Sequence, residues 1–240
     1  MSDQPLAGMT AVVTGGSGGI GQAIIRSLQE AGAKPASLDI SRPPDNEVLW
    51  LQCDVRSDDS VRAALQSFDQ QHGRLDLVIH AAGISRDAVV WKLAVEDWDL
   101  IQAVNLRGAF LLVRHAIPLM RQGKGGSVVL VGSINGSRGK FGTSAYSASK
   151  AGLLGLAKTV ARETGRFGIT VNVVEPGWVR TPLTEALPAE IRKAAVEETV
   201  LGTLLDPSDV AAAVLFLCGP GARHITGQIL RVDAGQVLGG

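Results

Sequence analysis

The sequence predicts a doubly wound α/β domain, in which a parallel sheet is covered by helices on both faces. Short β-branched runs alternate with longer helical patterns along the 240 residues, as expected for right-handed crossovers between parallel strands. A glycine-rich turn joins the first strand to the first helix, at the kind of edge where such sheets bind ligands. Because no repeat or linker interrupts this alternation, we expect one domain over residues 1–240.

The order of the elements follows from these patterns. The runs predicted as strands are Ala11–Thr14, Ala36–Ile40, Val48–Cys53, Leu75–His80, Ser127–Val131, Thr170–Glu175 and Gln228–Val232. The clearest helical patterns are Ile20–Glu30, Asp97–Met120 and Ser144–Gly165. A weakly amphipathic segment at about 182–206 follows the sixth strand without a strand of its own, and we interpret it as a mobile lid.

Composition and charge exclude several classes of protein. Lys plus Arg and Asp plus Glu both total 23 and no basic cluster occurs, which argues against a nucleic-acid partner. The longest strongly apolar stretch, Val210–Cys218, is shorter than the roughly 20 residues of a membrane span. Without signal-peptide features, we expect a cytoplasmic protein with a small-molecule substrate. Cys53 and Cys218 lack metal-site spacing, so we expect reduced core thiols and no metal.

The glycine turn at residues 14–21 predicts a dinucleotide, because a strand-to-helix turn brings phosphate to the positive end of a helix. Two glycine patterns fit it. Gly16, Gly18 and Gly21 form G-x-G-x-x-G, whereas Gly15, Gly19 and Gly21 form G-x-x-x-G-x-G. Spacing alone does not choose between them, and a flexible turn without a ligand is the plainer alternative.

Asp39 indicates which dinucleotide is preferred. It ends the second predicted strand 18 positions beyond Gly21, near the ~20-residue offset at which a carboxylate accepts the ribose hydroxyls. A 2′-phosphate about 4 Å away would be repelled by roughly 1 to 4 kcal/mol, which favours NAD over NADP. Arg42 is the nearby cation that could permit NADP instead. Asp54, after the third strand, is a weaker candidate that a turn or cap would also explain.

Tyr146 and Lys150 lie four residues apart, which places both on one face of a predicted helix. Tyr146 is the only tyrosine of the chain. A free tyrosine has a pKa near 10, so acting as a base requires a positive charge such as that of Lys150 to stabilise the phenolate. On its own, a Tyr and a Lys at this spacing are more often an exposed helical pair. A catalytic role therefore depends on which other residues accompany them in the sequence.

Together with other residues spread over nearly the whole chain, Tyr146 and Lys150 resemble the motifs of the short-chain dehydrogenase/reductase family. The matching residues, in family order and at family intervals, are Thr14-Gly15-x-x-x-Gly19-Ile20-Gly21, Asn105, Ser133, Tyr146 and Lys150. The resemblance implies a Rossmann-like domain with a seven-stranded parallel sheet, and it favours the G-x-x-x-G-x-G form. It also implies that Ser133 holds the substrate carbonyl oxygen and Tyr146 exchanges its proton. Lys150 would bind the ribose and polarise Tyr146, and Asn105 would anchor a water relay. From the residues alone, Ser133 could be a turn residue and Asn105 a polar residue that distorts its helix.

Further contacts follow from the same resemblance. The segment from Pro176 to Thr181 is similar to the family's nicotinamide-side loop, whereas His80-Ala81-Ala82-Gly83 matches N-N-A-G only in its last two residues. We therefore interpret His80 as structural. The implied cofactor contacts are Gly15, Ser17, Gly19, Ile20, Gly21, Asp39, Asp54, Val55, Ala82, Gly83, Tyr146, Lys150, Pro176, Gly177, Val179 and Thr181. The implied substrate contacts are Ser133, Asn135, Phe141, Tyr146 and Trp178.

Together these features predict an NAD-preferring oxidoreductase that interconverts a secondary alcohol, or a 3-hydroxyacyl compound, and its ketone. Segments such as residues 83–87 and 168–172 are most similar to 3-oxoacyl-[acyl-carrier-protein] reductases, so an NADPH-dependent reductase of that kind is the alternative. A non-catalytic dinucleotide sensor or scaffold is an alternative of another class. The resemblance also implies a homotetramer assembled through the two long helices, Asp97–Met120 and Ser144–Gly165.

Overall fold

The computed structural model contains a seven-stranded parallel sheet with the strand order β3-β2-β1-β4-β5-β6-β7. The structure describes residues 4–43, 48–123, 125–181, 184 and 188–238. The strands are β1 Thr10–Thr14, β2 Lys34–Asp39, β3 Leu49–Gln52, β4 Leu77–His80, β5 Gly126–Val131, β6 Ile169–Pro176 and β7 Ile229–Val232. This sheet confirms the predicted fold class and the seven predicted strands.

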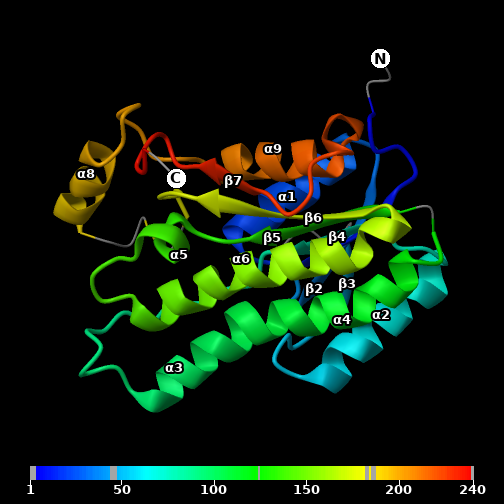
Figure 1. Ribbon diagram of the computed structural model, residues 1–240, viewed down its shortest axis with the longest axis horizontal. Helices are drawn as coiled ribbons and strands as arrows, with labels where there is room; N and C mark the ends of the chain where they lie inside the picture. The colour runs from blue at the N-terminus through cyan, green and yellow to red at the C-terminus, as the bar shows by residue number, and fades with distance from the viewer. Residues whose placement is uncertain (1–3, 44–47, 124, 182–183, 185–187, 239–240) are drawn as a thin grey trace.

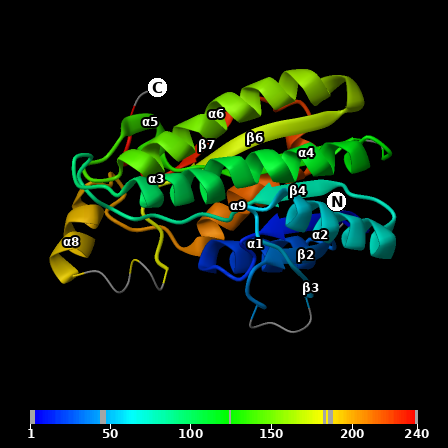
Figure 2. The same cartoon turned by 90° about the horizontal axis from the view of Figure 1, so that it is seen from below.

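Helices cover both faces of the sheet (Figure 1). One face is covered by α1 (Gly19–Glu30) and α9 (Pro207–Cys218). Helices α2 (Asp58–His72), α4 (Gly108–Met120) and α6 (Ser144–Thr164) cover the other (Figure 2). Because the central strands are buried on both sides, their residues alternate between the two cores, whereas the edge strands β3 and β7 are only partly buried. The remaining α-helices of the described chain are α3 Val95–Gln102, α5 Ile134–Arg138 and α8 Ala189–Glu197.

The predicted boundaries need small corrections. The strand boundaries differ from the predicted ones by at most two residues. For example, β4 begins at Leu77 instead of Leu75, because the Asp76 carboxylate accepts a hydrogen bond from the Thr10 amide before regular strand pairing starts. The predicted helix Asp97–Met120 is interrupted by a π-helical turn at Ala103–Arg107, which separates α3 from α4. Of the predicted lid, the structure places α8, whereas residues 182–183 and 185–187 lie outside the described residues.

The central strands β1 and β4 form the point where the strand order reverses, and ligands of such sheets bind beside the carboxyl ends there. The chain leaves β1 through Gly15, whose φ of +68° lies in the left-handed region. A Cβ atom on Gly15 would lie 2.6 Å from the backbone nitrogen of Ala82, just beyond β4. Only glycine therefore lets the turn pack directly onto the chain leaving β4.

Both cysteines are buried and free. Burial raises the pKa of Cys53 to about 11 and that of Cys218 to about 12, so both are neutral thiols at physiological pH. In the part of the chain that the structure describes, no helix is both long enough and apolar enough to cross a membrane. The same residues contain no group of three His, Cys, Asp or Glu side chains placed to hold a metal ion.

The contact between Gly15 and Ala82 predicts a specific pattern of stability loss. Gly73→Ala also places alanine at positive φ (+66°), but its Cβ would meet nothing within 4 Å, so we expect a loss of only about 1 to 2 kcal/mol. Gly15→Ala should lose more, because the backbone at Ala82 must also move, and its dinucleotide affinity should fall. Urea unfolding of the two variants measures the difference. Equal losses would show that the close approach carries no energy.

Candidate active site

The first part of the site is the open N-terminus of α1. No side chain caps this helix, and its first turn holds no acidic residue. Its amide groups and the positive end of its dipole therefore suit an anion such as a pyrophosphate. Gly15 combines a positive φ with a close backbone neighbour, whereas a Cβ atom on Gly16 would meet only side chains, which favours the G-x-x-x-G-x-G pattern. Gly19 and Ile20 are the first residues of the helix, and Gly21 packs against the Gly15 carbonyl.

Asp39 lies directly beside this turn, as its sequence offset predicts. Its carboxylate accepts hydrogen bonds from the backbone amides of Ser17 (3.0 Å) and Ser41 (3.1 Å). The Arg42 guanidinium instead lies 5.9 Å from the ring centroid of Trp50. A negative charge thus occupies the edge of the phosphate turn, while the nearby cation is directed to an aromatic ring.

The predicted cofactor residues that follow β3 differ in their surroundings. Arg56 pairs with both carboxylate oxygens of Asp54 and lowers the pKa of that carboxyl. Asp54 therefore behaves as the paired turn residue that the plainer alternative described. The Val55 side chain is buried in the core against Gly108, so any contact it makes with a dinucleotide would come from its backbone.

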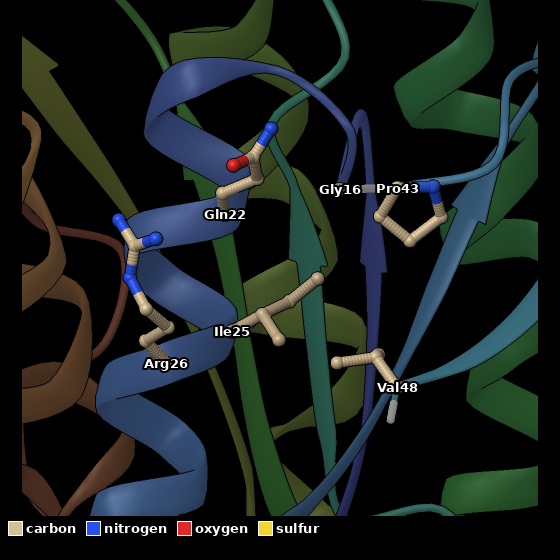
Figure 3. Close-up of a pocket in the computed structure, with 6 residues that line it drawn as sticks. All are labelled: Gly16, Gln22, Ile25, Arg26, Pro43 and Val48. Atoms are coloured by element: carbon tan, nitrogen blue, oxygen red, sulfur yellow. The ribbon is translucent and has the colours of Figure 1, made fainter. Parts of the chain in front are cut away.

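A small hollow lies behind the glycine turn, between α1 and the chain that joins β2 to β3 (Figure 3). Ile25 and Val48 point toward each other across it, while Gln22 and Arg26 lie along α1. Its volume of about 20 Å³ suits a single water molecule and is far too small for a nucleotide. A dinucleotide therefore does not fit this hollow, and the open carboxyl edge is the place where sheets of this kind bind such ligands.

Ser133, Tyr146 and Lys150 meet at the carboxyl end of β5. Ser133 follows the strand and caps α5, with its Oγ accepting the amide hydrogen of Asn135 at 3.2 Å. Lys150 projects from α6 and donates from Nζ to the Val131 carbonyl at 2.8 Å. The same Nζ lies 5.7 Å from the centroid of the Tyr146 ring, one helical turn away.

Burial sets the charge states of this group. It lowers the pKa of Lys150 to about 8, because an ammonium ion loses its hydration there. It also raises the pKa of Tyr146 above its ordinary value, although the interaction with the Ser133 hydroxyl opposes this and the charge of Asp87 adds to it. This direction is opposite to the lowering by Lys150 expected from the sequence. In the protein alone, Tyr146 is therefore a protonated phenol at neutral pH.

Asn105 sits within the π-helical turn and is completely buried. Its side chain clasps the backbone of Ile84, accepting from the amide at 2.9 Å and donating to the carbonyl at 3.0 Å. A second donor bond reaches Ser149 Oγ at 3.0 Å. These bonds fix Asn105 beside the site, so an expected water relay would use the lone pairs that remain on its oxygens.

His80 is the buried last residue of β4, and its ring connects the end of β1 to the π-helical turn. Its Nε2 lies 3.2 Å from the Asn105 carbonyl, which can only accept, so Nε2 carries the proton. Its Nδ1 lies 2.9 Å from the Thr14 hydroxyl, which therefore donates to it. Burial and the Lys150 charge lower the pKa of His80 to about 3, which keeps the ring neutral. This geometry supports the structural interpretation.

The predicted nicotinamide-side loop leaves β6 and packs on the C-terminal segment. Gly177 donates from its amide to the Val232 carbonyl at 2.8 Å, and Trp178 donates to Gln236 Oε1 at 2.9 Å. Val179 is buried in the core, and Thr181 bonds to Thr184 at 2.8 Å. The indole of Trp178 lies under the Lys140 ammonium, 4.1 Å from the ring centroid. Hydrogen bonds and packing within the protein therefore hold this loop in place.

Sequence reasoning missed an apolar groove beside Ser144. Its volume is about 200 Å³, and its lining residues are Ala88, Val89, Val90, Trp91, Lys140, Phe141, Gly142 and Ser144. The predicted contact Phe141 is 86% exposed and forms part of this wall, whereas Asn135 bonds to Arg138 at 3.2 Å. The apolar run at residues 88–91, placed in a loop, was the available signal for this groove.

Comparison with known proteins gives consistent results. A family model described as enoyl-(acyl carrier protein) reductase matches residues 15–236. The chain is 35% identical over 244 residues to a 3-oxoacyl-[acyl-carrier-protein] reductase of Thermotoga maritima, covering 97% of this chain and 99% of that protein. It is 36% identical over 248 residues to a (3R)-3-hydroxyacyl-CoA dehydrogenase of Canis lupus familiaris, covering 95% and 96%. The ligand-free aldohexose dehydrogenase of Thermoplasma acidophilum superimposes with a TM-score of 0.92 at 30% identity, covering 97% and 95%.

The pKa of Tyr146 can be measured directly, because it is the only tyrosine of the chain. Since burial raises this pKa, half of the phenolate absorbance in the near ultraviolet should develop above pH 10. Ser133→Ala should shift the midpoint higher still, because the Ser133 interaction lowers the pKa. Tyr146→Phe supplies the baseline. A midpoint at or below pH 10 would contradict the burial argument.

Proposed function

The chain belongs to the short-chain dehydrogenase/reductase family, and from this premise we propose that it interconverts a secondary alcohol or 3-hydroxyacyl compound and the corresponding ketone. It is an oxidoreductase that acts on CH–OH or keto groups and binds a nicotinamide dinucleotide. The proposal rests on the convergence of Ser133, Tyr146 and Lys150 at the carboxyl end of β5. That convergence does not favour the alternative of a non-catalytic sensor.

In the proposed reaction, Ser133 and Tyr146 hold the substrate oxygen with their hydroxyl groups. When bound, the nicotinamide supplies or accepts a hydride. Tyr146 donates its proton to the oxygen during reduction and takes it back during oxidation. Lys150 contributes a positive charge near the phenol ring and a donor for the ribose hydroxyls. Its charge matters more for oxidation, because burial alone disfavours the phenolate that accepts the proton.

Asp39 supports NAD as the preferred cofactor. Its carboxylate lies against the amide of Ser17, where the adenosine ribose of a dinucleotide on the glycine turn would be expected. A hydroxyl group can donate to this carboxylate, whereas a phosphate is repelled by it. NADPH remains the alternative, because the chain resembles 3-oxoacyl-[acyl-carrier-protein] reductases and this resemblance implies NADPH.

The apolar groove at residues 88–91 and 140–144 supports an acyl substrate. Val90, Trp91 and Phe141 are exposed large side chains that an acyl chain could cover. Two of the named relatives act on 3-oxoacyl and 3-hydroxyacyl compounds, and both kinds of substrate fit a ketone or alcohol held at Tyr146 with its chain in the groove. A 3-oxoacyl-[acyl-carrier-protein] reductase is therefore the second candidate.

The proposal retains a cytoplasmic homotetramer. The exposed apolar residues Trp98 on α3 and Phe110 on α4 support assembly through the long helices. The balanced charge of the chain gives no reason to add a nucleic-acid partner.

The function is tested by a panel of ketones and secondary alcohols, including 3-oxoacyl and 3-hydroxyacyl thioesters, with Tyr146→Phe as the decisive variant. Loss of the hydroxyl removes the proton donor, so kcat should fall on the order of 10²- to 10⁴-fold. NADH binding, followed by fluorescence, should be unchanged. Ser147→Ala, which removes a neighbouring hydroxyl bonded to Thr143, serves as the control. Full turnover by Tyr146→Phe would refute the mechanism.

Cofactor choice is tested at Asp39. Asp39→Asn keeps an oxygen for the Ser17 amide but removes the charge, so the affinity ratio of NADPH to NADH should rise roughly tenfold to a thousandfold. Parallel fluorescence titrations measure this ratio. Asp59→Asn, on the exposed surface of α2, should leave it unchanged. A wild-type protein that prefers NADPH would exclude Asp39 as the selector and support the acyl-carrier-protein reductase.

A further inference from the structure

Glu175 is a fully buried carboxylate behind the active site, and the proposed reaction does not use it. It lies on β6 immediately before Pro176, and its exposure is 0%. Its partner in the sheet register is Arg231 on β7, whose Nε lies 3.5 Å from Glu175 Oε2. A charge is rarely buried without a partner and a role, so the contacts of this carboxylate are informative.

The other carboxylate oxygen of Glu175 reaches α5. Oε1 accepts a hydrogen bond from Ser137 Oγ at 2.7 Å. The Glu175 side chain also lies close to Gly132, the residue before Ser133, because a Cβ atom on Gly132 would be 3.4 Å from Glu175 Cγ. Glu175 therefore contacts the chain on both sides of Ser133, which caps this helix.

Helix α5 needs such anchors because it is short. Its five residues, Ile134–Arg138, are far fewer than the roughly 12 that make an isolated helix marginally stable. Gly136 packs directly on the backbone of α6, where a Cβ atom would lie 2.9 Å from the Ala151 nitrogen. The bond between Ser137 and Glu175 fixes the helix to β6, on which the nicotinamide-side loop begins.

The ion pair between Glu175 and Arg231 connects the bond between Ser137 and Glu175 to the C-terminal segment. Arg231 Nη1 donates to the Val237 carbonyl at 3.2 Å. The neighbouring Gln236 accepts from the amide of Trp178, so the same segment holds the loop that follows β6. Glu175 thus stands between the two elements that carry Ser133 and Trp178.

We propose that Glu175 is a positioning residue that holds Ser133 in line with Tyr146 by anchoring α5 through Ser137. This rests on the proposed function, in which Ser133 holds the substrate oxygen. Glu175 itself touches no reacting atom. Because a displacement of about 1 Å can cost on the order of 100-fold in rate, loosening α5 should lower kcat without weakening dinucleotide binding.

The anchor is best tested at Ser137, because removing the Glu175 carboxylate would leave the partly buried Arg231 guanidinium without this ion pair and risks unfolding the protein. Ser137→Ala keeps the ion pair but removes the hydrogen bond. We expect kcat to fall on the order of ten- to a hundredfold, with the NADH dissociation constant unchanged. Ser137→Thr, which keeps a hydroxyl, should restore most of the loss.

A matched control removes a similar hydrogen bond between β5 and β6, at the end of these strands that is far from the active site. Ser127 on β5 and Thr170 on β6 share a hydroxyl contact of 3.0 Å at the amino ends of their strands. Ser127→Ala should leave kcat unchanged, even if its unfolding midpoint shifts as much as that of Ser137→Ala. Equal losses of kcat in the two variants would overturn the proposal, because they would reflect general destabilisation.

Hydrogen exchange gives a readout that needs no substrate. The amides of Gly136 and Gly139, bonded to the carbonyls of Ser133 and Asn135, should exchange faster in Ser137→Ala. If the wild-type protein turns over substrate and Ser137→Ala retains full kcat, the positioning role is wrong while the proposed function stands. If the wild-type protein turns over no substrate of the class, the proposed function is wrong. In that case, faster amide exchange in Ser137→Ala would still show that Ser137 anchors α5, whereas unchanged exchange would also refute the anchor.

Discussion

The buried ammonium group of Lys150 is the constraint on which the carboxyl edge of the sheet depends. The residue is 4% exposed, and a charge in such surroundings requires polar groups arranged around it. The carbonyl at the end of β5 accepts its hydrogen bond, and the Tyr146 ring lies beneath it. Gly83 provides the space on its other side, since a Cβ atom there would lie 3.3 Å from Nζ. Burial, together with the same charge, lowers the pKa of His80 to about 3, so the neutral ring can act as a fixed donor and acceptor.

Side-chain hydrogen bonds connect neighbouring elements along this edge of the sheet. Asp39 ties β2 to the glycine turn, and His80 ties the end of β1 to the π-helical turn. Glu175 ties β6 to α5. The backbone pairing of a parallel sheet stops at the strand ends, so these bonds continue the lateral connections into the loops that carry the site. Each loop is held by a polar group that is itself fully or partly buried.

The sequence predicted the sheet and its main helices because these depend on local patterns, whereas the residues proposed for the reaction centre came from a family resemblance. Strand alternation, the glycine spacing and the separation of Tyr146 from Lys150 are all visible within short windows. The missed features depend on distant contacts. The π-helical turn forms where Asn105 clasps Ile84, 21 positions away, and α5 is fixed by Glu175, 38 positions from Ser137. The raised pKa of Tyr146 likewise follows from burial that only the assembled fold creates.

The close packing of Gly15 on Ala82 also has a consequence for how the chain folds. The central strands β1 and β4 pair residues such as Ala11 and Leu77, which lie 66 positions apart. Pairing over such a separation must close a long loop before it gains contacts, which makes it a slow step. The phosphate cradle is complete only after β4 has docked beside the glycine turn. A dinucleotide therefore binds only chains that have passed this step, and by mass action it stabilises the finished sheet as well as serving as a reactant.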